Sequence, residues 1–252
     1  MTSLFSLAGQ TALVTGASRG LGQAIAVALA AAGANVICTS STQEGSRDTV
    51  AKITAAGGKA RGLAADLSNE AAVEQLAQQA LALGPIGILV NCGGTIFRAP
   101  AHEFPMQEWH KVMAVNVDAA FLLSQRLGTE MIKRQQGKII NIASMLSYSG
   151  GITVPAYTAS KHAIAGVTKA LANEWAQHNI QVNAIAPGYF KTDNTSALQA
   201  DTARNAAITA RIPAARWGEP EDLAGAAVFL ASGASNYVNG HILAVDGGWL
   251  AR

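Results

Sequence analysis

The chain has 252 residues, of which 50% are apolar and 13% are charged, with a net charge of +2 at pH 7. This length fits one large α/β domain or two small ones, and the lack of a basic run or a long apolar stretch argues against nucleic-acid and membrane partners. The two cysteines and five histidines lack disulfide or metal-ligand spacing, and the N-terminus lacks the order of a signal peptide, so we expect a cytoplasmic protein without a metal site.

Short apolar runs alternate with longer segments rich in alanine and leucine along the chain. The short runs are typical of strands buried on both faces, and the longer segments are typical of helices. The predicted strands cover residues 11–15, 35–39, 60–65, 86–90, 138–142, 180–186 and 242–245. The predicted helices cover residues 21–32, 47–56, 69–83, 106–134, 156–177 and 219–232, and the mixed segment 189–213 is expected to hold short helices.

This alternation predicts a doubly wound α/β fold with a parallel sheet covered on both faces. The sequence contains no internal repeat, linker or low-complexity tract. We therefore expect a single domain over residues 1–252.

The turn after the first predicted strand is rich in glycine. Its sequence, Thr-Gly-Ala-Ser-Arg-Gly-Leu-Gly, spaces the glycines as G-x-x-x-G-x-G and leads into an alanine-rich helix. Glycines permit a tight turn and close backbone approach, and a helix N-terminus presents amides to a pyrophosphate. A glycine cluster alone is a weak signal, but this position favours a dinucleotide site. The candidate contacts are Gly16, Ser18, Arg19, Gly20, Leu21 and Gly22.

The end of the second predicted strand bears on the choice between NAD and NADP. An acidic residue there would hydrogen-bond the ribose 2′-OH and repel a 2′-phosphate. The chain has Thr39 and Ser40 at this place, and the first acidic residue is Glu44. Hydroxyls, amides and Arg19 can receive a phosphate, although the same residues would suit an ordinary solvated turn. The sequence favours NADP(H) over NAD(H).

Tyr157 and Lys161 are four residues apart on a predicted helix, and Ser144 lies a short way upstream. Four residues is about one helical turn, so both side chains project from nearly the same face. An ammonium beside a phenol favours the phenolate, and a serine hydroxyl can hydrogen-bond a carbonyl oxygen. The three groups can move a proton on or off a C–O oxygen while a hydride moves on or off the carbon. In isolation, a packed tyrosine and a solvated lysine would be the commoner interpretation.

In their order and spacing these features resemble the short-chain dehydrogenase/reductase family, over essentially the whole chain. The residues that carry the resemblance are Thr15-Gly16, Gly20-Leu21-Gly22, Asp66-Leu67, Asn91, Gly93-Gly94, Asn116, Ser144, Tyr157, Lys161, Pro187-Gly188 and Thr192. The resemblance implies a Rossmann-type fold with seven strands in the order 3-2-1-4-5-6-7, and a homotetramer. The low charge content and the apolar helices 106–134 and 156–177 also favour an oligomer.

The resemblance further implies roles for individual residues. Tyr157 would be the acid/base, and Lys161 would lower its pKa and bind the nicotinamide ribose. Ser144 would polarise the substrate oxygen, and Asn116 would hold a water that links Lys161 to solvent. The implied cofactor contacts beyond the glycine loop are Asp66, Leu67, Asn91, Gly93, Tyr157, Lys161, Pro187, Gly188 and Thr192, with Asp66 at the adenine and Thr192 at the carboxamide.

One stretch departs from the family pattern. The chain has Asn91-Cys92-Gly93-Gly94 where the family usually has Asn-Asn-Ala-Gly. The second position loses an amide, and the extra glycine can loosen the loop. We expect Cys92 to be a small packed residue rather than a reactive thiol.

The two halves of the chain resemble different relatives. The C-terminal half, with Arg216-Trp217-Gly218 and Tyr237-Val-Asn-Gly240, resembles the 2-dehydro-3-deoxy-D-gluconate 5-dehydrogenases, also called 2-deoxy-D-gluconate 3-dehydrogenases. The cofactor half resembles NADPH-dependent 3-oxoacyl carrier-protein reductases. We expect an oxidoreductase for a secondary alcohol or ketone, with a deoxy-keto sugar acid as the substrate. The alternatives are a 3-oxoacyl or general ketone reductase and a dinucleotide-binding regulatory protein. Arg98 suits a substrate carboxylate, or is an exposed arginine.

Overall fold

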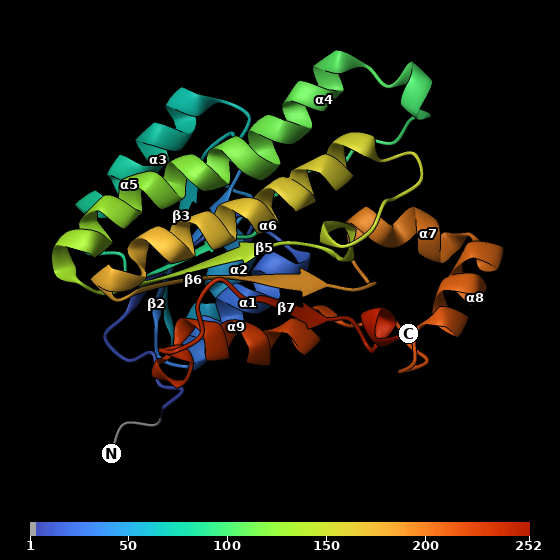
Figure 1. The fold of residues 1–252 in the computed structure, drawn as a ribbon. Helices are drawn as coiled ribbons and strands as arrows, with labels where there is room; N and C mark the ends of the chain where they lie inside the picture. The colour runs from blue at the N-terminus through green and yellow to red at the C-terminus, as the bar shows by residue number, and fades with distance from the viewer. Residues whose placement is uncertain (1–3) are drawn as a thin grey trace.

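Seven parallel strands form one sheet in the computed structural model, which describes residues 4–252 (Figure 1). The strands are β1 (Thr11–Val14), β2 (Asn35–Ser40), β3 (Lys59–Ala64), β4 (Ile88–Asn91), β5 (Gly137–Ile142), β6 (Ile180–Pro187) and β7 (Ile242–Val245). Their spatial order is β3-β2-β1-β4-β5-β6-β7. The prediction of a doubly wound, Rossmann-type parallel sheet with this strand order is confirmed.

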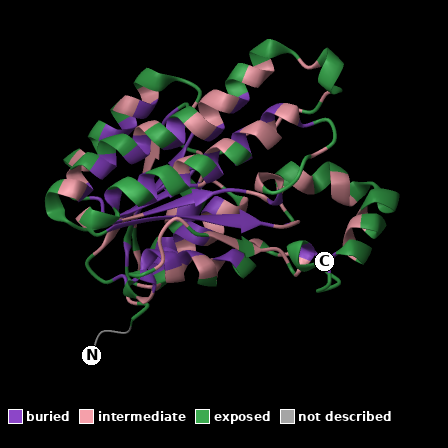
Figure 2. Ribbon diagram, in the orientation of Figure 1, coloured by how far each residue is buried: buried purple, intermediate pink, exposed green. Residues whose placement is uncertain are grey.

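Helices cover both faces of the sheet, and the strands between them are buried (Figures 1 and 2). One face carries α3 (Glu70–Ala82), α4 (Met106–Met113), α5 (Ala119–Arg134) and α6 (Pro155–Trp175). The other face carries α1 (Gly20–Ala31), α2 (Arg47–Ala55) and α9 (Ala224–Ala231). The short helices α7 (Ser196–Ala200) and α8 (Thr202–Arg211) stand beyond the end of β6, within the segment expected to hold short helices (Figure 1).

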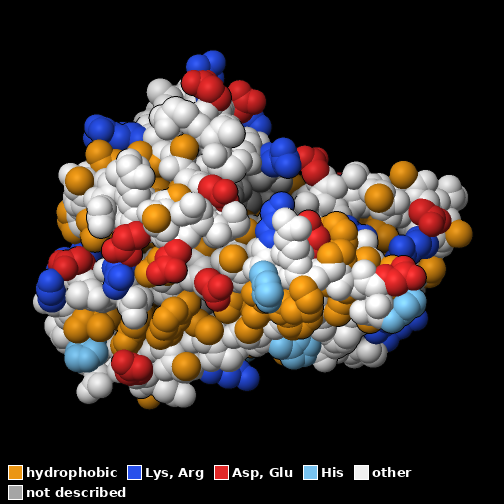
Figure 3. All heavy atoms as spheres, turned by 90° about the horizontal axis from the view of Figure 1, so that it is seen from above, with side chains coloured by type: hydrophobic (Ala, Val, Ile, Leu, Met, Phe, Trp, Pro, Cys, Tyr) orange, Lys and Arg blue, Asp and Glu red, His pale blue; other side chains and the backbone are white. Residues whose placement is uncertain are grey.

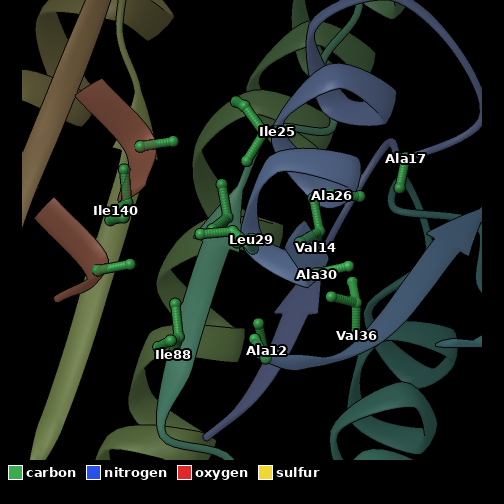
Figure 4. Packing of buried hydrophobic residues seen from close by; sticks show 14 of the residues in the cluster. Ala12, Val14, Ala17, Ile25, Ala26, Leu29, Ala30, Val36, Ile88 and Ile140 are labelled. Atoms are coloured by element: carbon green, nitrogen blue, oxygen red, sulfur yellow. The ribbon is translucent and has the colours of Figure 1, made fainter. Parts of the chain in front are cut away.

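Successive residues of a central strand enter opposite cores. Val14 of β1 packs in the cluster that contains Ile25 and Leu29 of α1 (Figure 4), whereas Leu13 packs with residues of α3 and α5. Both strand residues are fully buried. Because side chains alternate across a strand and both faces are covered, the strand must be apolar at every position. This burial explains the short continuous apolar runs of the sequence.

Residues 106–134 are helical throughout, as predicted, and a π-helical turn divides the stretch into two α-helices. A π-helical turn, Ala114–Asp118, separates α4 from α5 and contains Asn116. The Asn116 Oδ1 accepts from the backbone N–H of Thr95 at 2.8 Å, and its Nδ2 donates to Ser160 Oγ at 3.0 Å. A π turn inserts one extra residue into a helix and often occurs at functional sites. Here it brings a buried amide to the carboxyl end of the sheet.

Across residues 4–252, the helices are too short or too polar to cross a membrane.

Candidate active site

A cleft of about 210 Å³ opens at the carboxyl ends of the central strands, the edge where open α/β sheets bind ligands. The glycine loop, the loop after β4, helix α6 and the segment after β6 line it. The structure brings ten of the sequence-predicted residues to its wall, namely Gly16, Ser18, Arg19, Gly20, Leu21, Gly22, Gly93, Tyr157, Lys161 and Thr192.

Two glycines of the loop have no room for a side chain. Gly16 has a φ of +64°, and a Cβ on it would lie 2.7 Å from Gly93 Cα. A Cβ on Gly22 would lie 2.2 Å from the carbonyl oxygen of Gly16. The backbone therefore folds tightly onto the N-terminus of α1, which begins at Gly20. This arrangement fits the pyrophosphate of a dinucleotide, because free helix N–H groups attract anions.

Two side chains that the sequence did not indicate hold the glycine loop. Thr49 of α2 donates from Oγ1 to the carbonyl oxygen of Ala17 at 2.6 Å. Gln23 of α1 donates to the carbonyl oxygen of Ser18 at 3.3 Å and to Thr49 Oγ1 at 2.8 Å. These hydrogen bonds satisfy two carbonyl groups of the glycine loop. Thr49 and Gln23 belong to no sequence motif, so only the packing of α1 against α2 reveals their role.

The turn after β2 contains no free carboxylate. Thr39 and Ser40 are buried, and Ser40 Oγ donates to the carbonyl oxygen of Thr42 at 2.7 Å. Glu44, the first acidic residue after the strand, is ion-paired with Arg47. Thus the hydroxyl of Ser40 is used inside the turn, and the nearest acid is neutralised. No acidic side chain stands at the end of β2, where it would repel a 2′-phosphate, as the sequence predicted.

A threonine directly after β1 fixes the start of the loop after β4. Thr15 Oγ1 accepts from the N–H groups of Cys92 at 3.0 Å and of Gly93 at 2.9 Å. A Cβ on Gly93 would lie 2.3 Å from Leu67 Cδ1, so glycine at this unusual position lets Leu67 pack closely. Burial raises the pKa of the Cys92 thiol to about 12, which agrees with an unreactive packed residue.

The side chain of Asn91 lies behind the cleft. Its Nδ2 donates to Asn141 Oδ1 at 2.9 Å and to Ser124 Oγ at 3.2 Å, in a buried network between the sheet and α5. The structure therefore does not bring this side chain to the cleft wall. Sequence position alone could not reveal this, because it reports the end of the strand but not the direction of the side chain.

Tyr157 and Lys161 line the cleft, and Ser144 lies beside Tyr157 without lining the cleft itself. Ser144 caps a short 3₁₀ turn after β5, where its Oγ accepts from Leu146 N–H at 3.1 Å, and its hydroxyl hydrogen-bonds the phenol of Tyr157. Lys161 is 5% exposed, and its Nζ donates to the carbonyl oxygen of Ile142 at 2.7 Å. The predicted meeting of these three groups therefore occurs on α6 and the end of β5.

Burial dominates the proton affinities of these groups. Burial raises the pKa of Tyr157, while the hydrogen bond from Ser144 and the positive charge of Arg98 lower that pKa. Burial lowers the pKa of Lys161 to about 8. The family resemblance implies that Lys161 lowers the Tyr157 pKa; its ammonium lies over the ring, 5.4 Å from the centroid, and this role stays a prediction. Ser144 and Arg98 are groups that lower the pKa of this phenol.

The other predicted contacts lie at the same edge of the sheet, outside the cleft wall. Asp66, two residues after the end of β3, is exposed and accepts from Ser68 N–H at 2.9 Å and from Ser68 Oγ at 2.7 Å. Pro187 ends β6, and Gly188 N–H donates to the carbonyl oxygen of Val245 at 2.9 Å. Residues 4–252 contain no group of three or more His, Cys, Asp or Glu that could hold a metal ion.

Two arginines reach from separate loops to the segment that follows β6. We call residues 192–211, which include α7 and α8, the flap. Arg19 Nε lies 2.8 Å from Asp193 Oδ2, and Arg98 Nη2 donates to the carbonyl oxygen of Asn194 at 3.3 Å. The sequence did not indicate Asp193 and Asn194 as site residues, because a pairing between segments so far apart leaves no local pattern.

Comparison with known proteins agrees with this geometry. A family model described as enoyl-(acyl carrier protein) reductase matches residues 16–250. A 2-dehydro-3-deoxy-D-gluconate 5-dehydrogenase of Bacillus subtilis is 54% identical over 248 residues, which cover 98% of this chain and 97% of the relative. The chain belongs to the short-chain dehydrogenase/reductase family, whose members are NAD(P)-dependent enzymes acting on CH–OH groups. The identity extends over nearly the whole chain, so the resemblance to sugar-acid dehydrogenases is not confined to the C-terminal half.

Two solved structures are similar over nearly the full length. A candidate NAD(P)-dependent gluconate 5-dehydrogenase from Beutenbergia cavernae, with NADP bound at low occupancy, has a TM-score of 0.97 and 51% identity and covers 99% of this chain and 100% of its own. A candidate 2-deoxy-D-gluconate 3-dehydrogenase from Agrobacterium tumefaciens, with bound NADP, has a TM-score of 0.94 and 53% identity, with the same coverage.

Proposed function

We propose that the protein is an NADP(H)-dependent oxidoreductase that interconverts a secondary alcohol and a ketone on a deoxy-keto sugar acid, of the 2-dehydro-3-deoxy-D-gluconate type. One observation carries the proposal. The partly buried side chain of Tyr157 is hydrogen-bonded by Ser144 and lies in the field of a cation, Arg98. A proton donor beside a carboxylate-binding group suits a keto acid, because the donor serves the ketone and the cation serves the acid.

The residues of the cleft fit a bound dinucleotide. Gly16 and Gly22 have no room for a Cβ, and the glycine loop that they form leads directly into the N-terminus of α1. We propose that the glycine-loop amides hold the pyrophosphate and that Lys161 and Thr192 hold the nicotinamide end. The bound cofactor supplies or accepts the hydride. NADP(H) is favoured over NAD(H) because the turn after β2 has no unpaired carboxylate and because Arg19 supplies a positive charge.

The chain's own residues would control the proton. Tyr157 gives its hydroxyl proton to the carbonyl oxygen during reduction and takes it back during oxidation. Ser144 donates a hydrogen bond to the same oxygen and so polarises the C=O bond. Both N–H donors of the Asn116 amide are used by Thr95 and Ser160, so its side chain could hold a water only through the second lone pair of Oδ1.

Arg98 is our candidate for binding the substrate carboxylate. Its charge lowers the pKa of the Tyr157 phenol, so the guanidinium lies within electrostatic range of the reacting group. One Nη donates to the flap at the carbonyl oxygen of Asn194. A guanidinium carries five N–H donors in a fork that matches a carboxylate. A sugar acid would thus be oriented with its acid group at Arg98 and its ketone at Tyr157.

We also propose that the protein is a cytoplasmic homotetramer. Met106 of α4 is 60% exposed and Phe121 of α5 is 43% exposed, on the same face of the sheet. Figure 3 shows hydrophobic side chains gathered in bands between charged ones on this side of the molecule. Large apolar side chains on a helical face favour contact with another subunit. In the tail, Trp249 is buried within the chain against Tyr189, whereas Leu250 is 39% exposed.

The proposal is tested by measuring kcat/KM for a panel of sugar acids, keto acids and acyl-thioester ketones with NADPH and with NADH. We expect the highest kcat/KM for a deoxy-keto sugar acid with NADPH. Activity on acyl-thioester ketones without activity on sugar acids would instead identify a 3-oxoacyl reductase. A consistent preference for NADH would refute the NADP(H) assignment.

A further inference from the structure

An ion pair joins the glycine loop to the flap at the mouth of the cleft. Asp193 Oδ2 lies 2.8 Å from Arg19 Nε, and both residues line the cleft. The side chains are 74% and 71% exposed, so the contact is made at the surface and can be exchanged for another. The arginine that could recognise a 2′-phosphate is therefore already paired with a carboxylate.

The partner of Arg19 lies on the side of the cleft opposite to the candidate phosphate site. Asp193 follows Thr192, at the end of the sheet reached by β6, whereas the turn that would receive the phosphate follows β2. In the sheet order, β2 lies on one side of β1, and β4, β5 and β6 lie on the other. Arg19 follows β1, between the two. Contact with Asp193 and contact with a phosphate beside Ser40 therefore draw the guanidinium in opposite directions.

We propose that Asp193 is a cofactor-specificity residue that competes with the 2′-phosphate for Arg19, an inference that rests on the proposed NADP(H) function. A cofactor with the phosphate must take the guanidinium from Asp193, whereas a cofactor without it leaves the ion pair intact. Asp193 thus weakens the preference for the phosphorylated cofactor. An Asp193→Asn substitution keeps the shape of the side chain and removes the competing charge.

The competition for Arg19 is tested by measuring the binding of two cofactor fragments, so no enzyme turnover is needed. ADP-ribose and 2′-phospho-ADP-ribose differ only in the 2′-phosphate, and neither carries nicotinamide. Isothermal titration calorimetry at constant ionic strength gives the ratio of their Kd values. We expect Asp193→Asn to raise the preference for 2′-phospho-ADP-ribose by about two- to fivefold, because an exposed ion pair contributes up to about 1 kcal/mol, a factor of about five.

Two further variants show whether the effect passes through Arg19. Asp201→Asn removes the same charge from the flap; Asp201 caps α8 by accepting from Arg204 N–H at 3.0 Å, and asparagine caps equally well. We expect its ratio to equal that of the wild type. In an Arg19→Ala background, Asp193→Asn should leave the ratio unchanged, because the guanidinium for which the groups compete is gone.

The outcomes separate this inference from the proposed function. If the wild type prefers 2′-phospho-ADP-ribose but the ratio falls or stays constant in Asp193→Asn, the inference is overturned and the NADP(H) assignment stands. An equal rise in the Arg19→Ala background overturns it as well. If no variant distinguishes the two ligands, the NADP(H) assignment and the inference both fail.

Discussion

Lys161 Nζ donates a 2.7 Å hydrogen bond to the carbonyl oxygen of Ile142 and lies over the ring of Tyr157, 5.4 Å from its centroid. The lysine on α6 is thus tied to the last residue of β5. The helix and the strand position the phenol and the ammonium relative to each other, within the floor of the cleft. Changes to either side chain should therefore affect chemistry or proton binding more than fold.

We expect Tyr157→Phe to lose at least ~10²-fold in kcat, the scale of general acid/base catalysis. The phenylalanine keeps the packing of the ring and removes only the hydroxyl that Ser144 bonds. The measurement is steady-state turnover with NADPH and the substrate found in the panel. Circular dichroism and the Kd for NADPH serve as controls and should match the wild type. Turnover near the wild-type value would remove Tyr157 from the mechanism.

Lys161 should make stability depend on pH in the alkaline range. Burial lowers its folded-state pKa from 10.5 to about 8. Between these values the unfolded chain holds a proton that the folded chain lacks, so this residue's contribution to stability rises with pH. Relative to Lys161→Met, the wild type should gain on the order of 1–3 kcal/mol from pH 8 to 10.5. Urea unfolding of both proteins across this range measures the difference, and a constant difference would contradict the burial of the ammonium.

Arg98→Ala should raise KM for a sugar acid by about tenfold or more, the effect of losing a hydrogen bond to a charged group. The matched test compares the acid with a neutral ketose of similar size, for which KM should change little. Arg98 also contacts the flap at Asn194, so its loss could disturb the cofactor site. The Kd for NADPH is the control for this effect and should stay constant. An equal rise for both substrates would mean that Arg98 only positions the flap.

Gly22→Ala should destabilise the protein and weaken dinucleotide binding. The new Cβ would lie 2.2 Å from the Gly16 carbonyl oxygen, which must move and displace the glycine loop. We expect a loss of about 1–3 kcal/mol in unfolding free energy, the usual cost of overpacking. Gly225→Ala is the control, because a Cβ on this helical glycine meets nothing within 4 Å. It should leave binding unchanged and not reduce stability.

A homotetramer should have four times the mass of the chain in light scattering at micromolar concentration. Phe121→Asp places a charge on an apolar position that is 43% exposed on α5, and we expect smaller species. Lys133→Ala on the same helix is a matched surface control, since Lys133 only pairs with Glu130 three residues away. A monomeric mass for the wild type would refute the proposed assembly.

The positions of the strands along the chain and the placement of Tyr157 and Lys161 on one helical face followed from the sequence, because both depend on short-range periodicity. The order of the strands in the sheet came from the family resemblance. Apolar runs punctuated by glycine define the buried strands, and a four-residue spacing on a helix places two side chains on one face. The glycine loop was recognisable for the same reason. Its conformation is required by neighbours within a few residues, as the contact between Gly22 and Gly16 shows.

Only the tertiary structure decided which distant segments meet at the cleft. The π turn at Asn116 forms because its amide bonds Thr95 and Ser160, which come from another loop and another helix. The pairing of Arg19 with Asp193 depends on β1 and β6 delivering their following loops to one edge of the sheet. Local patterns carry no information about such contacts, because their geometry arises when the packed layers bring the ends of separate strands together.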